Sequence, residues 1–317
     1  MKNEQKDTRS RRRFLRSTGL IATGLAFTPS RIFAQESPVI ALRREAVNAP
    51  LKLQPVRGNI HLLTGSGGNI AVFNGPGGRL LVDAGIETSQ KKMADLLSTM
   101  SNDPLKYLVN THWHFDHAGG NEWLHSSGAT IVAHDNTRKN LAGTVRVEDW
   151  NYTFSPSPKG ALPETVFSTQ HTLHFNGEAI QMHHYPAAHT NGDISVYFPE
   201  KDVLHTGDLW WNGHYPFFDH SSGGAIDGMI AASDALLKIS NDKTIIIPGH
   251  GELGNRRQLS EFRHMLAKAR ENVSKLKKEG RSLQDTISAK PTAEFDPVYG
   301  NFLVSSAAFI KLVYVDV

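Results

Sequence analysis

The sequence predicts a mixed α/β fold, in which strands and helices alternate through two successive halves of the chain. Short apolar runs between turns rich in Gly and Pro indicate strands, and segments with apolar residues three or four positions apart indicate helices. Each sheet and helix must bury an apolar face against another layer, which favours an α/β or α+β architecture. At 317 residues, with 39% hydrophobic and 21% charged residues, the chain can form a large core.

The first 34 residues resemble a twin-arginine export signal. A basic stretch at 10–16 precedes a mildly apolar stretch at 20–27, and cleavage is expected after Ala34. We therefore expect the twin-arginine translocation machinery as a partner and a periplasmic or secreted location. A basic disordered tail is the alternative interpretation.

The charge balance changes once this segment is set aside. Residues 1–34 contain eight Lys or Arg and two Asp or Glu, whereas the whole chain has a net charge of +3, so the remainder carries about −3. An acidic remainder gives no electrostatic reason to bind nucleic acid. No apolar run of the mature chain reaches the ~18 residues that span a membrane. The absence of cysteine excludes disulfides.

The first half of the folded chain is predicted to begin with an antiparallel meander. Residues 35–56 contain three prolines and are expected to form a lead-in segment with little regular structure, ahead of one domain at 57–317. The elements expected next are strands at 60–63, 69–73 and 79–83, a helix at 88–100, a strand at 105–109, a helical segment at 121–124, a strand at 130–133 and a helix at 136–141.

The second half is predicted to repeat the order of strands and then helices. Residues 143–164 carry three prolines and no period, so we expect a surface excursion that flanks the site. The segment 302–313 is apolar enough to pack back on the core. Strands are expected at 172–175, 180–183, 194–198, 203–205 and 244–247, and helices at 225–239 and 256–279.

Three imidazoles and one carboxylate lie within six positions, immediately after the apolar run 107–109. The pattern is H-x-H-x-D-H, with His112, His114, Asp116 and His117. In extended backbone, alternate side chains point to one side, and a helix starting near Asp116 would turn His117 toward the same pocket. Imidazole nitrogen and carboxylate oxygen are ligands of zinc and related divalent ions. The pattern therefore predicts a metal site in preference to a merely polar loop.

Three further potential ligands follow predicted strands farther along the chain: His189, Asp208 and His250. Together with the first cluster they make five histidines and two aspartates. Two metal ions with three protein ligands each and one bridging carboxylate need about that number, with positions left for water. A dinuclear centre is therefore the predicted site.

With these residues in this order, the chain from about residue 57 to its end resembles the metallo-β-lactamase fold superfamily. The resemblance implies a four-layer αββα sandwich, in which two sheets face each other and helices cover their outer faces. It also implies a structural role beside the metals for Asp83. The first metal would be bound by His112, His114 and His189, the second by Asp116, His117 and His250, and Asp208 would bridge the two.

Part of the chain is similar to subclass B1 β-lactamases, namely the runs 189–199 and 203–207. The next residue departs from that subclass, because B1 enzymes have a cysteine where this chain has Asp208. The B1 lysine that holds the lactam carboxylate is also missing, since 209–237 contain no Lys or Arg. A buried anionic group without a cationic partner is unfavourable. Carboxylated lactams are therefore expected to be poor substrates.

The resemblance implies two zinc ions as cofactors, with iron or manganese as alternatives because Asp208 makes the site rich in oxygen. A hydroxide bridging the metals would attack the substrate carbonyl, and Asp116 is the expected catalytic residue that orients it. The loop after Asp208 is rich in aromatic residues, which could belong to the core but more readily form an apolar substrate wall. The candidate pocket residues are Trp210, Trp211, Asn212, His214 and His220.

These observations predict an exported dinuclear zinc hydrolase of a small carbonyl substrate, similar to β-lactamases. A lactonase, esterase or thioesterase similar to glyoxalase II is the alternative, although the chain after His250 looks too short for a separate glutathione-binding domain. More remote alternatives are a di-iron oxidoreductase and a non-catalytic metal binder. The sequence does not identify the substrate and predicts no oligomeric state.

Overall fold

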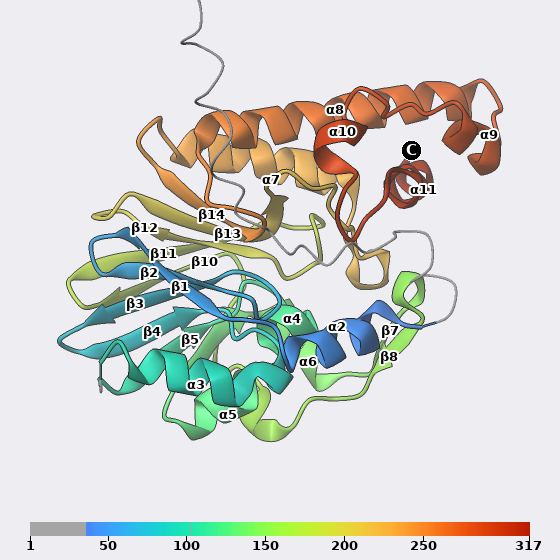
Figure 1. The fold of residues 1–317 in the computed structure, drawn as a ribbon. Helices are drawn as coiled ribbons and strands as arrows, with labels where there is room; N and C mark the ends of the chain where they lie inside the picture. The colour runs from blue at the N-terminus through green and yellow to red at the C-terminus, as the bar shows by residue number, and fades with distance from the viewer. Residues whose placement is uncertain (1–35, 102) are drawn as a thin grey trace, which may run out of the picture.

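The computed structural model describes residues 36–101 and 103–317 (Figure 1). Two β-sheets pack face to face, and helices cover the outer face of each, so the molecule has four layers in the order αββα. This arrangement confirms the mixed α/β class and the layered form that the resemblance implied. The predicted export signal at 1–34 lies outside the described residues.

The first sheet consists of β1 (Lys52–Arg57), β2 (Ile60–Thr64), β3 (Ile70–Gly75), β4 (Gly78–Val82), β5 (Leu105–Val109), β6 (Thr130–His134) and β9 (Thr165–Phe167), side by side in this order. Strands β1 to β4 pair antiparallel, as the predicted meander. Strands β4, β5, β6 and β9 pair parallel. Parallel strands point their carboxyl ends at one edge of the sheet, where polar loops can converge on a ligand.

The second sheet consists of β10 (Gln170–Phe175), β11 (Glu178–His184), β12 (Ile194–Phe198), β13 (Val203–Trp211) and β14 (Ile245–His250), in this order. Its strands are antiparallel except for the last pair, β13 and β14. Strand β13 is longer than the predicted 203–205. Gly207 and Asp208 interrupt its apolar pattern, and register shifts against β14 occur on both sides of Gly207, so sequence periodicity missed its second half.

The helices cover the outer faces of the two sheets (Figure 1). Helices α3 (Gln90–Ser98) and α5 (Asn121–Ser126) pack on the first sheet, and α7 (Ile226–Ile239) and α8 (Arg256–Lys278) cover the second. Helix α8 begins with a capping box, because the Asn255 side chain accepts from the Gln258 backbone and the Gln258 side chain accepts from the Asn255 backbone. The remaining helices and turns are α2 (Pro38–Ala46), η1 (Glu87–Ser89), α4 (Phe115–Ala118), α6 (Asp135–Ala142), η2 (Glu148–Trp150), η3 (Lys159–Ala161), η4 (His220–Ser222), α9 (Leu283–Ser288), α10 (Asp296–Tyr299) and α11 (Ser306–Asp316).

The core between the sheets is built from their facing apolar side chains. Phe73 on β3 meets Phe198 on β12, with ring centroids 5.3 Å apart in an edge-to-face arrangement. Both rings are fully buried, and each such side chain stabilises the fold by about 1.5–3 kcal/mol relative to exposure. The facing apolar side chains therefore hold the two sheets against each other.

The lead-in segment is more regular than expected. Residues 38–46 form α2, and residues 52–57 form the edge strand β1 of the first sheet. Ser37 caps the helix by accepting from the Val39 backbone, and Pro38 occupies the first turn, where its missing N–H costs nothing. The prolines indicated irregular structure, but one starts a helix and another lies on an edge strand, two positions that tolerate proline.

The excursion at 143–164 also contains regular structure. It folds into a two-stranded hairpin of β7 (Val145–Val147) and β8 (Tyr152–Phe154), joined through η2. At the tip, Asn151 adopts a left-handed conformation with φ of 46°, which asparagine tolerates better than most residues. The short strands fall below the length at which alternation can be recognised.

The C-terminal segment packs back on the core, as predicted. The Phe309 ring of α11 stacks on Tyr215 with centroids 4.3 Å apart, and both are fully buried. The Tyr215 hydroxyl donates to Asp296 at 2.7 Å. Among the described residues, none of the helices combines the length and the apolar character needed to traverse a membrane.

The Phe309 contact gives a stability prediction. We expect Phe309→Ala to lower the free energy of unfolding by about 3–5 kcal/mol, because it removes a fully buried ring and leaves a cavity. Urea unfolding followed by circular dichroism measures the change. Val315→Ala on the same helix is the control, since that side chain is 59% exposed and should shift stability by less than about 0.5 kcal/mol. Equal effects of the two substitutions would contradict the packing role.

Candidate metal centre

The seven residues singled out as ligands meet at one edge of the two sheets. His112 and His114 lie in the turn between β5 and α4, while Asp116 and His117 lie on α4 itself. The others come from the second sheet: His189 from the loop between β11 and β12, Asp208 from within β13, and His250 from the end of β14. All seven are buried, in two groups whose ligand atoms lie within 4.8 Å of one another.

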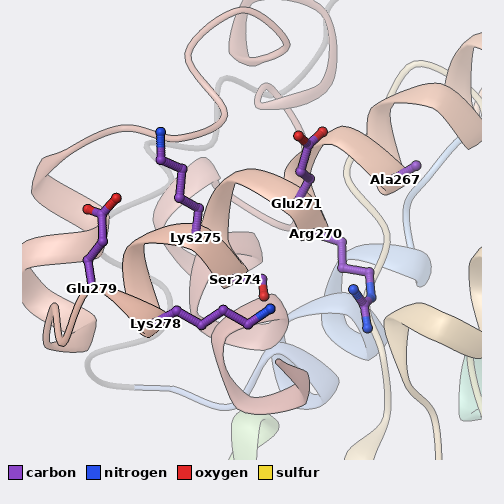
Figure 2. A pocket seen from close by; sticks show the side chains of 7 residues that line it. All are labelled: Ala267, Arg270, Glu271, Ser274, Lys275, Lys278 and Glu279. Carbon is purple, nitrogen blue, oxygen red and sulfur yellow. The ribbon is translucent and has the colours of Figure 1, made fainter.

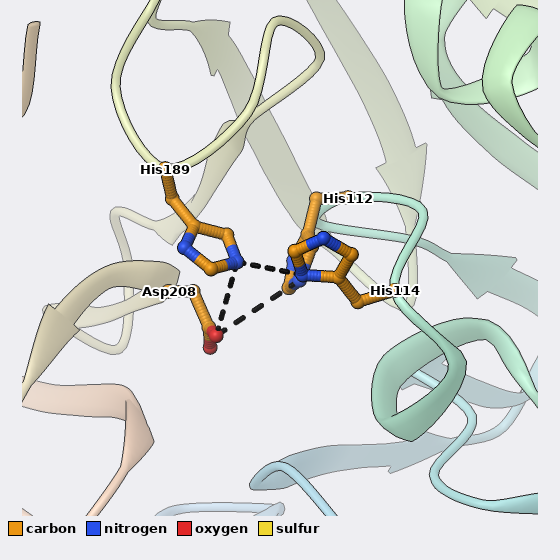
Figure 3. A group of neighbouring side chains, drawn as sticks. All are labelled: His112, His114, His189 and Asp208. Carbon is orange, nitrogen blue, oxygen red and sulfur yellow. Dashed lines mark hydrogen bonds and ion pairs between the residues drawn. The ribbon is translucent and has the colours of Figure 1, made fainter. Parts of the chain in front are cut away.

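The first group contains His112, His114, His189 and Asp208 (Figure 3). The Nε2 atom of His189 lies 2.8 Å from Nδ1 of His114. It also lies 3.3 Å from Oδ2 of Asp208, and the His112 Nε2 atom lies 3.9 Å from the same oxygen.

The second group contains Asp116, His117 and His250, and Asp208 links it to the first. The Nε2 atom of His250 lies 3.3 Å from Oδ2 of Asp116 and 3.4 Å from Oδ2 of Asp208. The His117 Nε2 atom lies 3.0 Å from the other Asp208 oxygen, Oδ1. Residue 249 must be glycine for this arrangement, because a Cβ there would overlap Asp208 Oδ1.

Each histidine of the centre has one ring nitrogen that faces the other ligands and one that faces away. Where the nitrogen that faces away donates a hydrogen bond, the inward nitrogen of the neutral ring carries a lone pair. His189 Nδ1 donates to the Phe217 carbonyl at 2.8 Å, and His114 Nε2 donates to Asp219 Oδ2 at 3.0 Å. In the neutral rings, the His189 and His114 nitrogens that lie 2.8 Å apart then both carry lone pairs and cannot bond each other. A cation between them removes that repulsion.

Other atoms that face the centre also favour a bound cation. Thr111 Oγ1 donates to Asp83 and therefore accepts from Nδ1 of His112, at 3.1 Å. The inward Nε2 of His112 is buried and has no hydrogen-bond partner among the described residues. Unpaired buried polar atoms are costly. A divalent cation that prefers nitrogen and oxygen ligands fits these residues.

The protonation of the metal-free centre follows from its carboxylates. Burial lowers the pKa of His117, but Asp208, Asp116 and Asp83 outweigh it and raise that pKa well above its usual value. Burial also lowers the pKa of His250, but Asp208 and Asp116 outweigh burial and raise that pKa to about 9. Without a cation, these two rings therefore carry the protons that balance the buried carboxylates.

The first group behaves differently. Burial, followed by the neighbouring charge of His117, holds the pKa of His112 well below its usual value. Burial also lowers the pKa of His114, although Asp219 opposes the shift. These two imidazoles are neutral at pH 7, which is the state that binds metal.

Asp83 holds the metal loop from behind. It accepts from the Thr111 backbone at 2.7 Å, from the Thr111 hydroxyl at 2.7 Å and from His117 Nδ1 at 2.8 Å. Its own backbone is left-handed, with φ of 70°, a strained conformation that these hydrogen bonds maintain. The position agrees with the structural role that the resemblance implied for Asp83.

Asp219 is a supporting residue that sequence reasoning missed. It is fully buried and accepts from His114 Nε2 at 3.0 Å and from the Ser222 hydroxyl at 2.5 Å. Burial raises its pKa, but the hydrogen bond and charge of His114 outweigh burial and lower it, so Asp219 is a carboxylate. No local motif marks this residue, and only its place beside two histidines in the aromatic loop could have suggested it.

The His189 loop is fixed by another aspartate of the run that resembles subclass B1. Asp193 Oδ2 accepts from the backbone of His189 at 2.7 Å and of Thr190 at 2.8 Å. Burial raises the pKa of Asp193 to about 6. These hydrogen bonds therefore fix the turn that presents His189 to the centre.

The proposed pocket residues fall into two sets. Trp211 lies 4.4 Å from the His250 ring, between ring centroids, and His214 stacks on Phe302 at 4.3 Å beside the same ligand. The other three contact the protein elsewhere. Trp210 is fully buried in the core beneath α8, which corrects its placement in a pocket wall open to substrate. The Asn212 amide donates to the Glu252 carbonyl, and His220 donates to Asp316 at 3.0 Å.

A shallow hollow on the exposed side of α8 is unrelated to the centre (Figure 2). Its lining comes from one helix and mixes both charges, and it includes none of the seven clustered residues. Arg270 in this hollow is paired with Asp227.

Comparisons with known proteins find relatives in two groups of enzymes. The chain is 27% identical over 171 residues to a hydroxyacylglutathione hydrolase of Pelagibacter ubique, covering 52% of this chain and 59% of that protein. The chain thus spans about three fifths of the length of this relative. It is also 23% identical over 200 residues to a type 2 metallo-beta-lactamase of Bacteroides fragilis, covering 62% of this chain and 73% of that one.

Solved structures share the fold. The DIM-1 metallo-beta-lactamase superposes with a TM-score of 0.57 at 21% identity, over 70% of this chain and all of that one. The sec-alkylsulfatase Pisa1 from Pseudomonas sp. gives a TM-score of 0.64 at 17% identity, over 83% of this chain and 50% of that one. The sequence profile of the metallo-beta-lactamase superfamily matches residues 63–250, from β2 to the last of the clustered histidines. This chain is therefore a member of the metallo-beta-lactamase superfamily, and its matched relatives are hydrolases.

Proposed function

We propose that this chain is an exported dinuclear zinc hydrolase that acts on a carbonyl substrate. The observation that carries the proposal is the convergence of imidazole nitrogens and carboxylate oxygens from seven buried residues, with the inward His112 nitrogen left without a partner among the described residues. Superfamily membership and hydrolase relatives support the reaction class.

Each group of residues would hold one metal ion. His112, His114 and His189 would bind the first, and Asp116, His117 and His250 the second. Asp208 would bridge them, because its two oxygens face both groups. Two bound divalent cations supply water of lowered pKa and polarise a carbonyl oxygen. Iron or manganese is the alternative to zinc, because Asp208 supplies an oxygen ligand where subclass B1 enzymes have a thiolate.

The chain's own residues complete the chemistry. The Asp116 side chain is 11% exposed, more than any of the other ligands, and its Oδ2 atom lies 3.3 Å from His250. It can accept a hydrogen bond from an incoming water and orient that water toward the substrate. Asp83 and Asp219 fix the rings of His117 and His114 and keep their inward nitrogens unprotonated when metal is bound.

The substrate is proposed to lack the carboxylate of common β-lactams. Asp208 stands where subclass B1 enzymes have cysteine, and 209–237 contain no Lys or Arg to hold an anionic group. A lactone, ester or thioester fits this site better, and the hydroxyacylglutathione hydrolases among the relatives favour a thioester as the second candidate.

Export is proposed from the sequence alone. Residues 1–34 resemble a twin-arginine signal, whose translocation machinery carries folded cargo. This route would let the chain take up its metals before it reaches the periplasm or is secreted.

The function is tested by a substrate panel. We expect the zinc-loaded mature protein to hydrolyse at least one of a chromogenic β-lactam, lactone, ester or thioester. His114→Ala should lower kcat/KM by about a thousandfold, because a lost ligand forfeits about 4 kcal/mol of transition-state stabilisation. His264→Ala removes an exposed histidine and is the control. Undiminished turnover by His114→Ala would exclude this centre as the active site.

Metal binding should release protons. Because the raised pKa values of His117 and His250 keep both rings protonated at pH 7 in the metal-free protein, zinc must displace those protons. Affinity should therefore fall as pH decreases from about 9, by about tenfold per pH unit for each proton released. Calorimetry in two buffers of different ionisation enthalpy counts the protons. A count of zero at pH 7 would contradict the proposed second site.

The role of Asp219 is tested by Asp219→Asn. We expect a 10- to 100-fold loss of zinc affinity at the first site, because the amide cannot accept from His114 Nε2 with the strength of a carboxylate. Competition with a chromogenic chelator measures it. Asp234→Asn is the matched control, since Asp234 pairs only with Arg263 at the surface. Unchanged affinity in Asp219→Asn would remove its positioning role.

A further inference from the structure

Two aromatic side chains from distant parts of the sequence flank the clustered ligands. Phe302 comes from the segment between α10 and α11, and Trp150 comes from η2 in the β7–β8 hairpin. Neither is among the candidate residues of the aromatic loop.

Phe302 lies on the His250 side of the centre. Its ring centroid is 4.3 Å from that of His214, in a stacked arrangement, and 6.1 Å from those of Trp211 and His250. It is nevertheless 37% exposed, although large apolar side chains are usually buried. An exposed aromatic ring next to buried ligands is suited to contact a bound molecule.

Trp150 lies on the His114 side. Its ring is 4.7 Å from the His114 ring and stacks on Phe217 at 4.9 Å, measured between centroids. Phe217 itself provides the carbonyl that accepts from His189. Trp150 is half-buried, so part of its surface remains open beside the first group of ligands.

Contacts of the C-terminal segment lie next to both aromatic residues. The Tyr215 backbone donates to the Tyr299 carbonyl at 2.9 Å, which fixes the approach to Phe302. Lys311 of α11 donates to Asp149, next to Trp150, at 2.5 Å. The C-terminal segment therefore contacts the rest of the protein close to each of the two aromatic residues.

The basic residues around Phe302 and Trp150, which form the two walls beside the centre, are already paired with carboxylates. Arg43 faces Glu87 at 2.7 Å, Arg146 faces Glu148 at 3.0 Å, and Lys311 faces Asp149. Among the described residues of the elements that carry the two walls, these contacts leave no free cation to receive an anionic substrate group. Burial of such a group against aromatic faces would be unfavourable.

We propose that Phe302 and Trp150 are specificity-determining residues that select an uncharged carbonyl substrate with apolar or aromatic substituents. This inference rests on the proposed hydrolase function and narrows it to neutral esters, lactones or thioesters. Phe302 packs against the substituent on the His250 side, and Trp150 packs against the one on the His114 side.

The test compares two 4-nitrophenyl esters that differ in one terminal group. The hexanoate ends in a methyl group, and the mono-adipate ends in a carboxylate on a chain of matching length. We expect zinc-loaded wild type to prefer the hexanoate at least tenfold in kcat/KM. Phe302→Ala should raise KM for the hexanoate about fivefold with kcat within twofold, and Phe302→Arg should shift preference toward the adipate. Trp150→Ala should likewise raise KM for the hexanoate.

Val298→Ala is the matched control, because Val298 is a 60% exposed apolar residue of the same C-terminal segment. It should leave both esters unaffected, and zinc content should stay at two ions per chain in every variant. Equal use of the two esters by wild type, or unchanged KM in Phe302→Ala, would overturn the inference while leaving the hydrolase intact.

A failure of the hydrolase function itself has a different signature. In that case no ester, lactone or thioester is turned over by zinc-loaded wild type. Calorimetry with the inert amide N-phenylhexanamide and its carboxylate analogue, N-phenyladipamic acid, then tests the walls alone. Tighter binding of the neutral amide, lost in Phe302→Ala, would support the selectivity, and equal binding of the two would overturn it.

Discussion

The Asp208 carboxylate is the charge on which the arrangement of the centre depends. It is buried, and its two oxygens face imidazole nitrogens from both groups of ligands. Although burial raises its pKa, the charges of His117, His250 and His189 lower that pKa well below its usual value. A buried carboxylate is stable only with positive charge close by. Protons on His117 and His250 provide that charge without metal, and cations replace the protons when metal binds.

This constraint explains why so much of the structure lies behind the ligands. Three of the outward ring nitrogens have their own acceptors: Asp83 for His117, Asp219 for His114 and the Phe217 carbonyl for His189. These acceptors decide which nitrogen keeps its lone pair for the centre. They come from both sheets, so the ligand geometry depends on the packing of the whole sandwich. The C-terminal helices take part because they hold the loop that carries Phe217 and Asp219.

The flanks of the centre are largely aromatic. Aromatic rings contact the ligands on both sides, and the neighbouring basic residues pair with carboxylates. A low-polarity rim strengthens the electrostatic interactions inside it. Under the proposed function, the same rim also disfavours anionic substrates, so the reaction at the centre and the substrate selectivity would have one physical origin.

The sequence by itself determined most of the longer strands and the long helices, because periodicity is a property of neighbouring residues. It also determined the chemical identity of the groups that meet at the centre, since a dense H-x-H-x-D-H run has few other uses. Only the tertiary structure decided that α2 and the second half of β13 are regular, and that Trp210 belongs to the core. It alone placed Asp219, Trp150 and Phe302 beside the ligands. Such contacts join residues far apart in the chain, and they arise when sheets, hairpin and C-terminal helices pack together, which no local pattern records.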